Sequence, residues 1–248
     1  MLQELFDHVD IPRGRPLLVH ARLRHIHRRT GTDYEKLTDL LLQCLLDCNP
    51  SHLLIPAYTI YSFYLSRVFH LNYSHSEVGR FSEELRRRGF KRTFDPMYSM
   101  LDITESLPKE LDYTKTFGHQ SVCDFLCRNN GIVINVDMPG FYSTPVHAVE
   151  LEHLVPYRHI MELTGHMQKK NLDWQQITYT TYIRAVDRHG SGSFPPYNQK
   201  RRIEFLRHRK IITEWKNKTA HLAWAPLENF CAAIDNALSK DPFFLVDP

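Results

Sequence analysis

The chain has 248 residues, 42% of them hydrophobic and 24% charged, and a formal net charge of +3 at pH 7. This composition is typical of one globular domain that buries its core without disulfides or a structural metal, so we expect a single domain over residues 1–248. The small positive charge favours a phosphorylated small molecule as partner and argues against a nucleic acid. No apolar run reaches the ~20 residues of a membrane span, and the first residues lack a secretory signal, so we expect a cytoplasmic protein without a membrane partner.

The first half of the chain contains apolar runs of strand length and leucines at helical spacing. These patterns predict strands at 16–20 and 51–56 and helices at 34–48 and 76–88. Thr32 or Asp33 is expected to cap the first helix, because a short polar side chain there accepts a hydrogen bond from a free backbone N–H. The second helix has arginines in its last turn, which suits the helix dipole, and Gly89 is expected to end it.

The second half continues the alternation of strands and helices. We expect helices at 121–130, 144–153 and 226–240, strands at 131–137 and 178–187, and a loop rich in glycine and proline at 188–197. Together these elements predict an α/β fold with a central, largely parallel or mixed sheet flanked by helices. Ligands of such sheets bind beyond the carboxyl ends of the strands, so the residues just after 16–20, 51–56 and 131–137 are the first candidates for chemistry.

His147 and Glu150 follow one of these strands, near the start of a predicted helix. A spacing of three residues places both side chains on one helical face. A carboxylate that accepts the proton of one imidazole nitrogen raises the basicity of the ring and leaves the other nitrogen free as a base. Acyl transfer to an amine needs such a base, because the attacking nitrogen must lose a proton. Taken alone, however, the spacing favours a structural or surface pair, since the chain has 15 histidines.

The residues around this pair resemble a known family. Residues 143–158 read Ser-Thr-Pro-Val-His-Ala-Val-Glu-Leu-Glu-His-Leu-Val-Pro-Tyr-Arg, similar to a Thr-x-x-His-x-x-Glu segment ending in Val-Pro-Tyr-Arg in the aminoglycoside 3-N-acetyltransferase superfamily. Other similar segments keep the family's order along the chain, at 18–23, 54–59, 78–99, 117–126 and 232–245. The resemblance implies that family's fold, acetyl-CoA or another acyl-CoA as co-substrate without a metal, and transfer of the acyl group to the amine of an amino sugar.

The same resemblance implies roles for individual residues. His147 is the general base, Glu150 is the carboxylate that orients it, and Thr144 places a hydroxyl near the thioester. The residues expected to bind the coenzyme are His20, Arg22, Arg24, Ser99 and Ser121. The residues expected near the acceptor are Tyr58, Tyr61 and Tyr98, although the aromatic run at 58–64 is also typical of the edge of a core.

Two departures from the family's pattern bear on the acceptor. Ala21 and Arg22 replace both serines of the family's His-Ser-Ser-Leu turn, and Tyr98 replaces a histidine in its His-Pro-x-His-Ser element. These changes point away from antibiotic-modifying enzymes and toward the branch that acylates nucleotide-linked amino sugars in surface-polysaccharide pathways. Two alternatives remain open: an aminoglycoside antibiotic 3-N-acetyltransferase, and a catalytically silent module that binds coenzyme A or a sugar.

A cysteine, two aspartates and a basic cluster could each have a functional role, but each also fits an ordinary structural one. Cys123 lies at the start of a predicted helix and could be a nucleophile, but core packing is the more ordinary role for it. Asp95 or Asp137 could join histidines at a metal, but no His-x-x-x-His spacing supports a metal site. The basic cluster at 200–202 is expected to be solvated, and a homodimer is the default oligomer.

Overall fold

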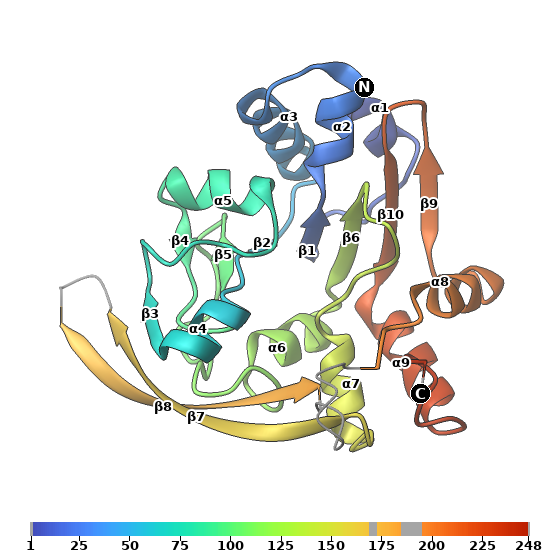
Figure 1. Cartoon of the computed structure of the whole chain (residues 1–248). Helices are drawn as coiled ribbons and strands as arrows, with labels where there is room; N and C mark the ends of the chain where they lie inside the picture. Colours follow the sequence, from blue (N-terminus) through green and yellow to red (C-terminus); the bar gives the residue numbers. More distant parts are fainter. Residues whose placement is uncertain (1, 169–172, 185–194, 248) are drawn as a thin grey trace.

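The computed structural model describes residues 2–168, 173–184 and 195–247. A seven-stranded sheet with the order β4-β5-β2-β1-β6-β10-β9 forms its centre, and a second sheet has the order β3-β7-β8 (Figure 1). The strands are β1 (Pro16–Ala21), β2 (His52–Pro56), β3 (Val68–His70), β4 (Lys91–Arg92), β5 (Met100–Asp102), β6 (Ile132–Val136), β7 (Arg158–Gln168), β8 (Trp174–Arg184), β9 (Thr213–Lys216) and β10 (His221–Pro226). The helices are α1 (Leu2–Asp7), α2 (Leu23–Thr30), α3 (Tyr34–Asp47), α4 (Ile60–Ser66), α5 (Arg80–Arg87), α6 (Val122–Arg128), α7 (Val146–Glu152), α8 (Gln199–His208) and α9 (Leu227–Leu238).

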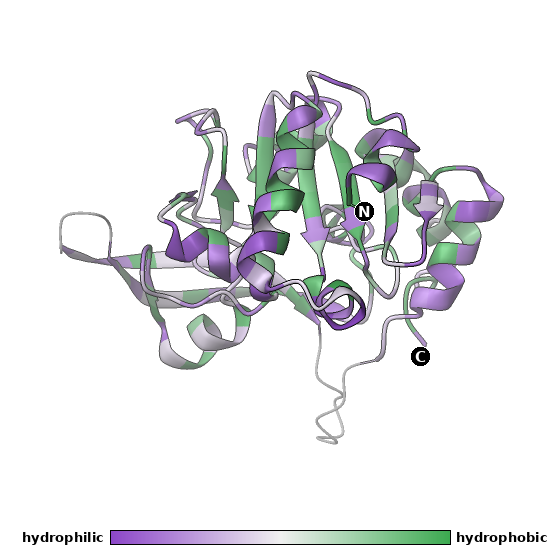
Figure 2. Cartoon of the chain, turned by 90° about the horizontal axis from the view of Figure 1, so that it is seen from above, coloured by the Kyte–Doolittle hydropathy of each residue, from purple (hydrophilic) through white to green (hydrophobic). Residues whose placement is uncertain are grey.

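The middle of the large sheet is parallel and buried on both faces. β1 pairs in parallel with β2 and with β6, and these strands are apolar because successive side chains point to opposite, covered faces. Leu17 and Val19 pack with α1, α2, α3 and α5, whereas Leu18 packs with α6, α7 and α9. Figure 2 shows these central strands as the most hydrophobic elements, with polar residues on the outer surfaces of the helices.

The edges of the large sheet are antiparallel, so the sheet is mixed. β10 runs antiparallel to β6 and β9, and β5 runs antiparallel to β2 and β4. The prediction of a mixed α/β sheet flanked by helices is confirmed, but the parallel pairing is confined to its centre. β9 and β10 had no sequence prediction. β9 is a short edge strand without an apolar run, and β10, which lies between β6 and β9, has only four buried residues in its apolar run.

The second sheet is built on a long hairpin that is separate from the large sheet and extends away from it (Figure 1). β7 and β8 pair antiparallel over eleven residues each, and β3 joins β7 in parallel. β7 begins at Arg158, six residues after the end of α7 at Glu152, so the root of the hairpin stands beside that helix. The hairpin therefore brings its first residues to the His147 side of the molecule.

Most predicted elements are present, and one helix starts later than expected. Asp33, not Thr32, caps α3 by accepting a hydrogen bond of 2.8 Å from the Lys36 N–H. The helix expected from residue 76 begins only at Arg80, because Gly79 has a φ of +124°, which no helical residue adopts. Residues 185–187 of the expected strand and 188–194 of the expected loop lie outside the described residues. No described helix is long and apolar enough to cross a membrane.

Candidate active site

A cavity of about 1010 Å³ opens at the carboxyl ends of β1 and β2, where the α/β topology predicts ligands. Its walls come from α2, α4, α5 and α7, from the root of the β7–β8 hairpin and from α8. The elements that form it are distant in the sequence and meet only in the folded chain. This volume lies at the upper end of the range for small-molecule sites, which leaves room for two ligands at once.

His147 and Glu150 face one another on α7, beside this cavity. The His147 Nδ1 lies 2.5 Å from Glu150 Oε2, and the carboxylate is fully buried. Tyr157 donates its hydroxyl to the other oxygen, Glu150 Oε1, at 2.9 Å. Because the carboxylate is the nearest partner of Nδ1, we assign the ring proton to that nitrogen and the lone pair to Nε2. The pair is thus oriented as a carboxylate–imidazole couple in which one nitrogen is left to accept a proton.

Arg158 is a third member of this group. Its Nε lies 2.7 Å from Glu150 Oε2, and one of its terminal nitrogens lies 3.0 Å from the His147 Nδ1 and 3.3 Å from the His147 Nε2. Because the ring proton is on Nδ1, this terminal N–H can be donated only to the Nε2 lone pair. Burial and the Arg158 charge lower the pKa of His147 to about 4, although Glu150 acts in the opposite direction. Glu150 thus raises the basicity of the imidazole as expected, but burial and Arg158, which the sequence did not show, outweigh it. Because of the lowered pKa, His147 is neutral, and able to accept a proton, throughout the neutral pH range.

The three tyrosines predicted near the acceptor all line the cavity. Tyr58 and Thr144 join through their hydroxyls, and the Tyr58 ring lies 5.1 Å from the ring of Tyr98. Phe117 does not line the cavity itself; it packs against the Tyr98 ring and meets the His147 ring edge to face at 5.7 Å. Tyr61 stands at the mouth of the cavity, with 65% of its side chain exposed. An apolar, aromatic surface thus leads from the mouth to the imidazole.

The five residues predicted to bind the coenzyme fall into two groups. His20, Arg22 and Arg24 follow β1 and line the cavity. Ser99 and Ser121 are fully buried and do not line it. Ser99 donates to the Ala57 carbonyl and accepts from the Arg92 guanidinium, whereas Ser121 caps α6. Because their hydroxyls already have internal partners, the expectation that these two serines contact a ligand is wrong.

Several residues that line the cavity had no predicted role. Arg158 ends the Val-Pro-Tyr-Arg motif, which was the available signal for it. Tyr197 donates to Glu150 Oε1 at 3.2 Å, and its ring stacks near His147 at 6.1 Å. Arg202 belongs to the basic cluster expected to be solvated, yet only 4% of it is exposed. No sequence pattern pointed to Tyr197 or Arg202, because both reach the site through the packing of α8.

The lining of the cavity is strongly cationic. Six arginines line it, namely Arg22, Arg24, Arg80, Arg158, Arg184 and Arg202. The only carboxylate in the described lining belongs to Glu77, and both of its oxygens accept backbone N–H groups at the start of α4, from Tyr61 at 3.0 Å and Ser62 at 2.7 Å. The cavity is therefore suited to anionic ligands.

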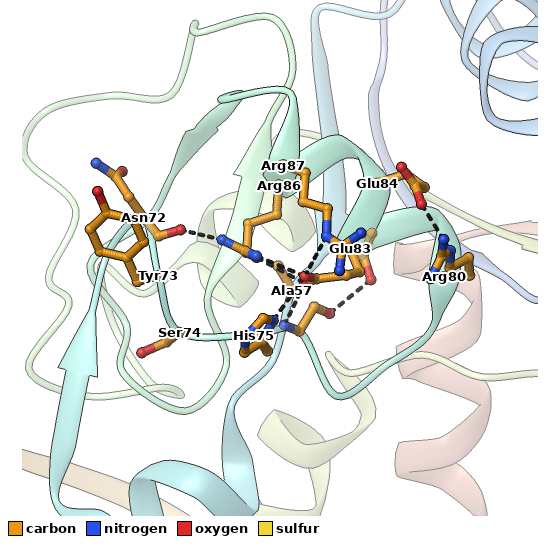
Figure 3. Close-up of polar contacts among 12 residues, drawn as sticks. Ala57, Asn72, Tyr73, Ser74, His75, Arg80, Glu83, Glu84, Arg86 and Arg87 are labelled. Atoms are coloured by element: carbon orange, nitrogen blue, oxygen red, sulfur yellow. Dashed lines mark hydrogen bonds and ion pairs between the residues drawn. The ribbon is translucent and has the colours of Figure 1, made fainter. Parts of the chain in front are cut away.

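The rim of the cavity near α5 is held by a group of ion pairs around Glu83 (Figure 3). The Glu83 carboxylate accepts from Arg86 and Arg87 of its own helix and from the backbone of Ser76 in the preceding loop. Burial alone would raise the pKa of Glu83, but these hydrogen bonds outweigh it and hold the pKa well below its usual range. The contacts fix the loop that carries Gly79, whose φ of +124° is a backbone conformation that favours glycine.

The alternative chemistries find little support in the described residues. Cys123 is 1% exposed and does not line the cavity, and burial raises the pKa of its thiol well above the usual value. Asp95 accepts hydrogen bonds from the backbone of Met97 and Tyr98, and Asp137 lies 3.3 Å from Arg29. Among the residues that the structure describes, no group of three His, Cys, Asp or Glu side chains is placed to hold a metal ion.

Comparisons with known proteins show what the chain is similar to. No family model and no curated protein sequence matches it. Among solved structures, the aminoglycoside acetyltransferase AAC(3)-IVa superposes with a TM-score of 0.71 and 16% identity, over 100% of this chain and 90% of that one. AAC-IIIb, solved with CoASH, gives 0.75 and 14% over 100% and 97%, and AAC-VIa, solved with sisomicin, gives 0.71 and 12% over 96% of each chain. The chain therefore has the fold of the aminoglycoside 3-N-acetyltransferases, as the resemblance implied.

Proposed function

We propose that this chain is an acyl-CoA-dependent N-acyltransferase that moves an acyl group, normally acetyl, to the amine of an amino sugar. The observation that carries the proposal is a neutral His147, held by a buried Glu150 and placed on the wall of a cavity large enough for two substrates. The same arrangement, on the fold of known acetyltransferases, supports direct transfer without a covalent acyl-enzyme. We further propose that residues 1–248 act as one domain in the cytoplasm, where acyl-CoA is available, as a homodimer.

In the proposed reaction the acceptor nitrogen attacks the thioester carbonyl carbon, and the C–N bond forms as the C–S bond breaks. His147 Nε2 takes the proton that the nitrogen must lose, and passes it to the departing sulfur. The buried Glu150 carboxylate stabilises the imidazolium while it carries that proton. The hydroxyls of Thr144 and Tyr58 are placed to orient the thioester, and the charges of Arg22 and Arg24 suit the coenzyme phosphates.

The charge of the cavity favours an anionic acceptor. Coenzyme A carries phosphates of its own. Arg80 and Arg158 pair with Glu84 and Glu150, but Arg22, Arg24 and Arg202 lie on two sides of the cavity, which is more positive charge than one such ligand needs. An aminoglycoside is a polycation and would find no uncommitted carboxylate in the described lining. A nucleotide-linked amino sugar brings its own phosphates, so we propose that acceptor and a role in surface-glycan synthesis. The aminoglycoside alternative is supported by the fold of AAC(3)-IVa and AAC-IIIb.

The test is release of free thiol from acetyl-CoA in the presence of a panel of acceptors. The panel contains nucleotide-linked amino sugars, the same sugars without the nucleotide, and aminoglycosides. We expect release with nucleotide-linked sugars and little with aminoglycosides. Preference for an aminoglycoside would overturn the acceptor assignment. Measurable CoA binding with no release for any acceptor would identify a silent binding module and overturn the enzymatic proposal.

A further inference from the structure

Three of the arginines that the structure describes are buried, and their partners differ. Arg92 is 4% exposed and donates to Ser99 Oγ and to backbone carbonyls, one of them that of Ala57. Arg158 is 8% exposed and lies beside the Glu150 carboxylate. Arg202 donates one N–H to the side chain of Gln199, but its Nε has no hydrogen-bond partner, and no described carboxylate lies within ion-pair distance of it. Arg202 is thus the one buried described arginine that lacks both a counter-charge and a full set of acceptors.

An uncompensated buried cation destabilises a protein, because the charge has lost its water and gained nothing in exchange. Burial lowers the pKa of Arg202 below the ordinary value for arginine, and the nearby Tyr197 and Glu150 offset this only in part. The side chain lines the cavity, however, so a ligand can reach it. An anion bound there would supply both the missing charge and the missing acceptor.

Two other unpartnered polar atoms lie on the cavity wall, His20 Nε2 and Ser143 Oγ, and both are buried. His20 stands beside Asn135 on the neighbouring strand, and the Asn135 side chain holds the backbone of Tyr142 with hydrogen bonds of 2.8 and 2.7 Å. The guanidinium of Arg202 lies 5.9 Å from the centre of the Tyr142 ring. These contacts bring the three side chains to one rigid part of the wall, anchored on β1, β6 and α8.

This part of the wall adjoins the base. Burial, together with the smaller effects of the nearby Arg202 and His147, lowers the pKa of His20 to about 3. His20 is therefore neutral and can donate one N–H. It lies on the face of the sheet that α7 and α8 cover, whereas Arg22, Arg24 and Arg80 belong to the α2 and α5 side. Arg202 and the neutral His20 thus lie on one side of the cavity, and Arg22, Arg24 and Arg80 lie on the other.

We propose that Arg202, Ser143 and His20 form an anion subsite that binds a phosphate group of the acceptor. The assignment to the acceptor rests on the proposed function, in which the arginines of the opposite side take the coenzyme and His147 meets the acceptor amine. Binding of the phosphate there fixes the distance from the sugar amine to the imidazole, so the subsite selects acceptors that carry a phosphate. Arg202 acts on specificity, and it takes no part in proton transfer.

The test uses Arg202→Met, with Lys200→Met as a control that removes an exposed charge from the same helix. Thermal unfolding is followed in saturating CoA while inorganic phosphate or UDP is titrated. We expect both ligands to stabilise the wild type and the control. They should bind at least about 30-fold more weakly to Arg202→Met, because the bound anion then loses its buried cationic partner. Without ligands, Arg202→Met should melt at the same temperature as the wild type or higher, since the variant buries no unpaired charge.

Three outcomes would overturn the proposal: unchanged phosphate and UDP binding by Arg202→Met, a ligand-free melting temperature several degrees below that of the wild type, or a loss of CoA affinity as large as the loss of UDP affinity. Ser143→Ala provides a second variant, expected to weaken UDP binding about tenfold through one lost hydrogen bond to a charged group. CoA binding is measured separately in the wild type. Its absence would count against the proposed function, and the phosphate titration without CoA would still test the subsite.

Discussion

Two groups of residues in the same cavity have different origins in the sequence. The base group is continuous: Thr144, His147, Glu150 and Arg158 lie within 15 residues, just before α7, on α7 and at the start of β7. The neighbouring anion-subsite group, His20, Ser143 and Arg202, comes from three segments spread over most of the chain. Local spacing brings the first group together, because a helix places residues three apart on one face. Only tertiary packing brings the second together, so it shows no pattern that a single sequence reveals.

The largest expected loss of kcat follows from removing the base. We expect His147→Ala to lower kcat by a factor of about 10²–10⁴, the usual contribution of a general base, with CoA affinity nearly unchanged. Steady-state thiol release and CoA titration measure the two quantities. His208→Ala, an exposed histidine in the last turn of α8, serves as control. Normal turnover by His147→Ala would show that the base has been wrongly assigned.

A smaller effect is expected from the carboxylate, because it orients the base and does not itself accept the proton. Glu150→Gln keeps the shape of the side chain and an oxygen that can accept from Nδ1, so kcat should fall by only about tenfold. The comparison is made at saturating substrates in the same thiol-release assay. A loss equal to that of His147→Ala would mean that the charge of Glu150 is as essential as the imidazole.

Arg158 is expected to set the pH dependence of kcat/KM. Burial and, after it, the Arg158 charge lower the pKa of His147, so the acidic limb of the kcat/KM profile should lie near pH 4 in the wild type. Arg158→Gln removes that influence, and the limb should move upward toward the ordinary histidine pKa of about 6.5. At pH 5 the variant then loses a larger share of its plateau rate than the wild type does. Arg158→Lys retains the charge and should retain the limb; an unmoved limb in Arg158→Gln would contradict this role.

The smallest effect is expected from the thiol alternative. Cys123→Ala should change kcat by less than about twofold, because a buried thiol with a raised pKa supplies no thiolate for acyl transfer. Mass spectrometry after mixing with acetyl-CoA should detect no acetylated protein. A stable acetyl adduct at Cys123 would replace direct transfer with a covalent route.

The same difference between local spacing and tertiary packing decides which parts of the fold and the site the sequence could predict. The strands at 16–20, 51–56 and 131–137 are long apolar runs, so β1, β2 and β6 were predictable, and with them the edge where the cavity opens. His147 and Glu150 were predictable from spacing and family resemblance. The lowered pKa of His147 was not, because it depends on burial and on Arg158 lying across the imidazole. Ser99 and Ser121 were misplaced because sequence does not show that internal partners already occupy their hydroxyls.

The central claim is that His147 is neutral and open to a proton at physiological pH. An NMR titration of the imidazole carbon signals, assigned to His147 by their loss in His147→Ala, tests it without any substrate. We expect a pKa near 4, well below the ordinary histidine value, with a neutral ring from pH 6 upward. A His147 that is still protonated at pH 7 could not take the proton from the attacking amine, and the mechanism would have no base.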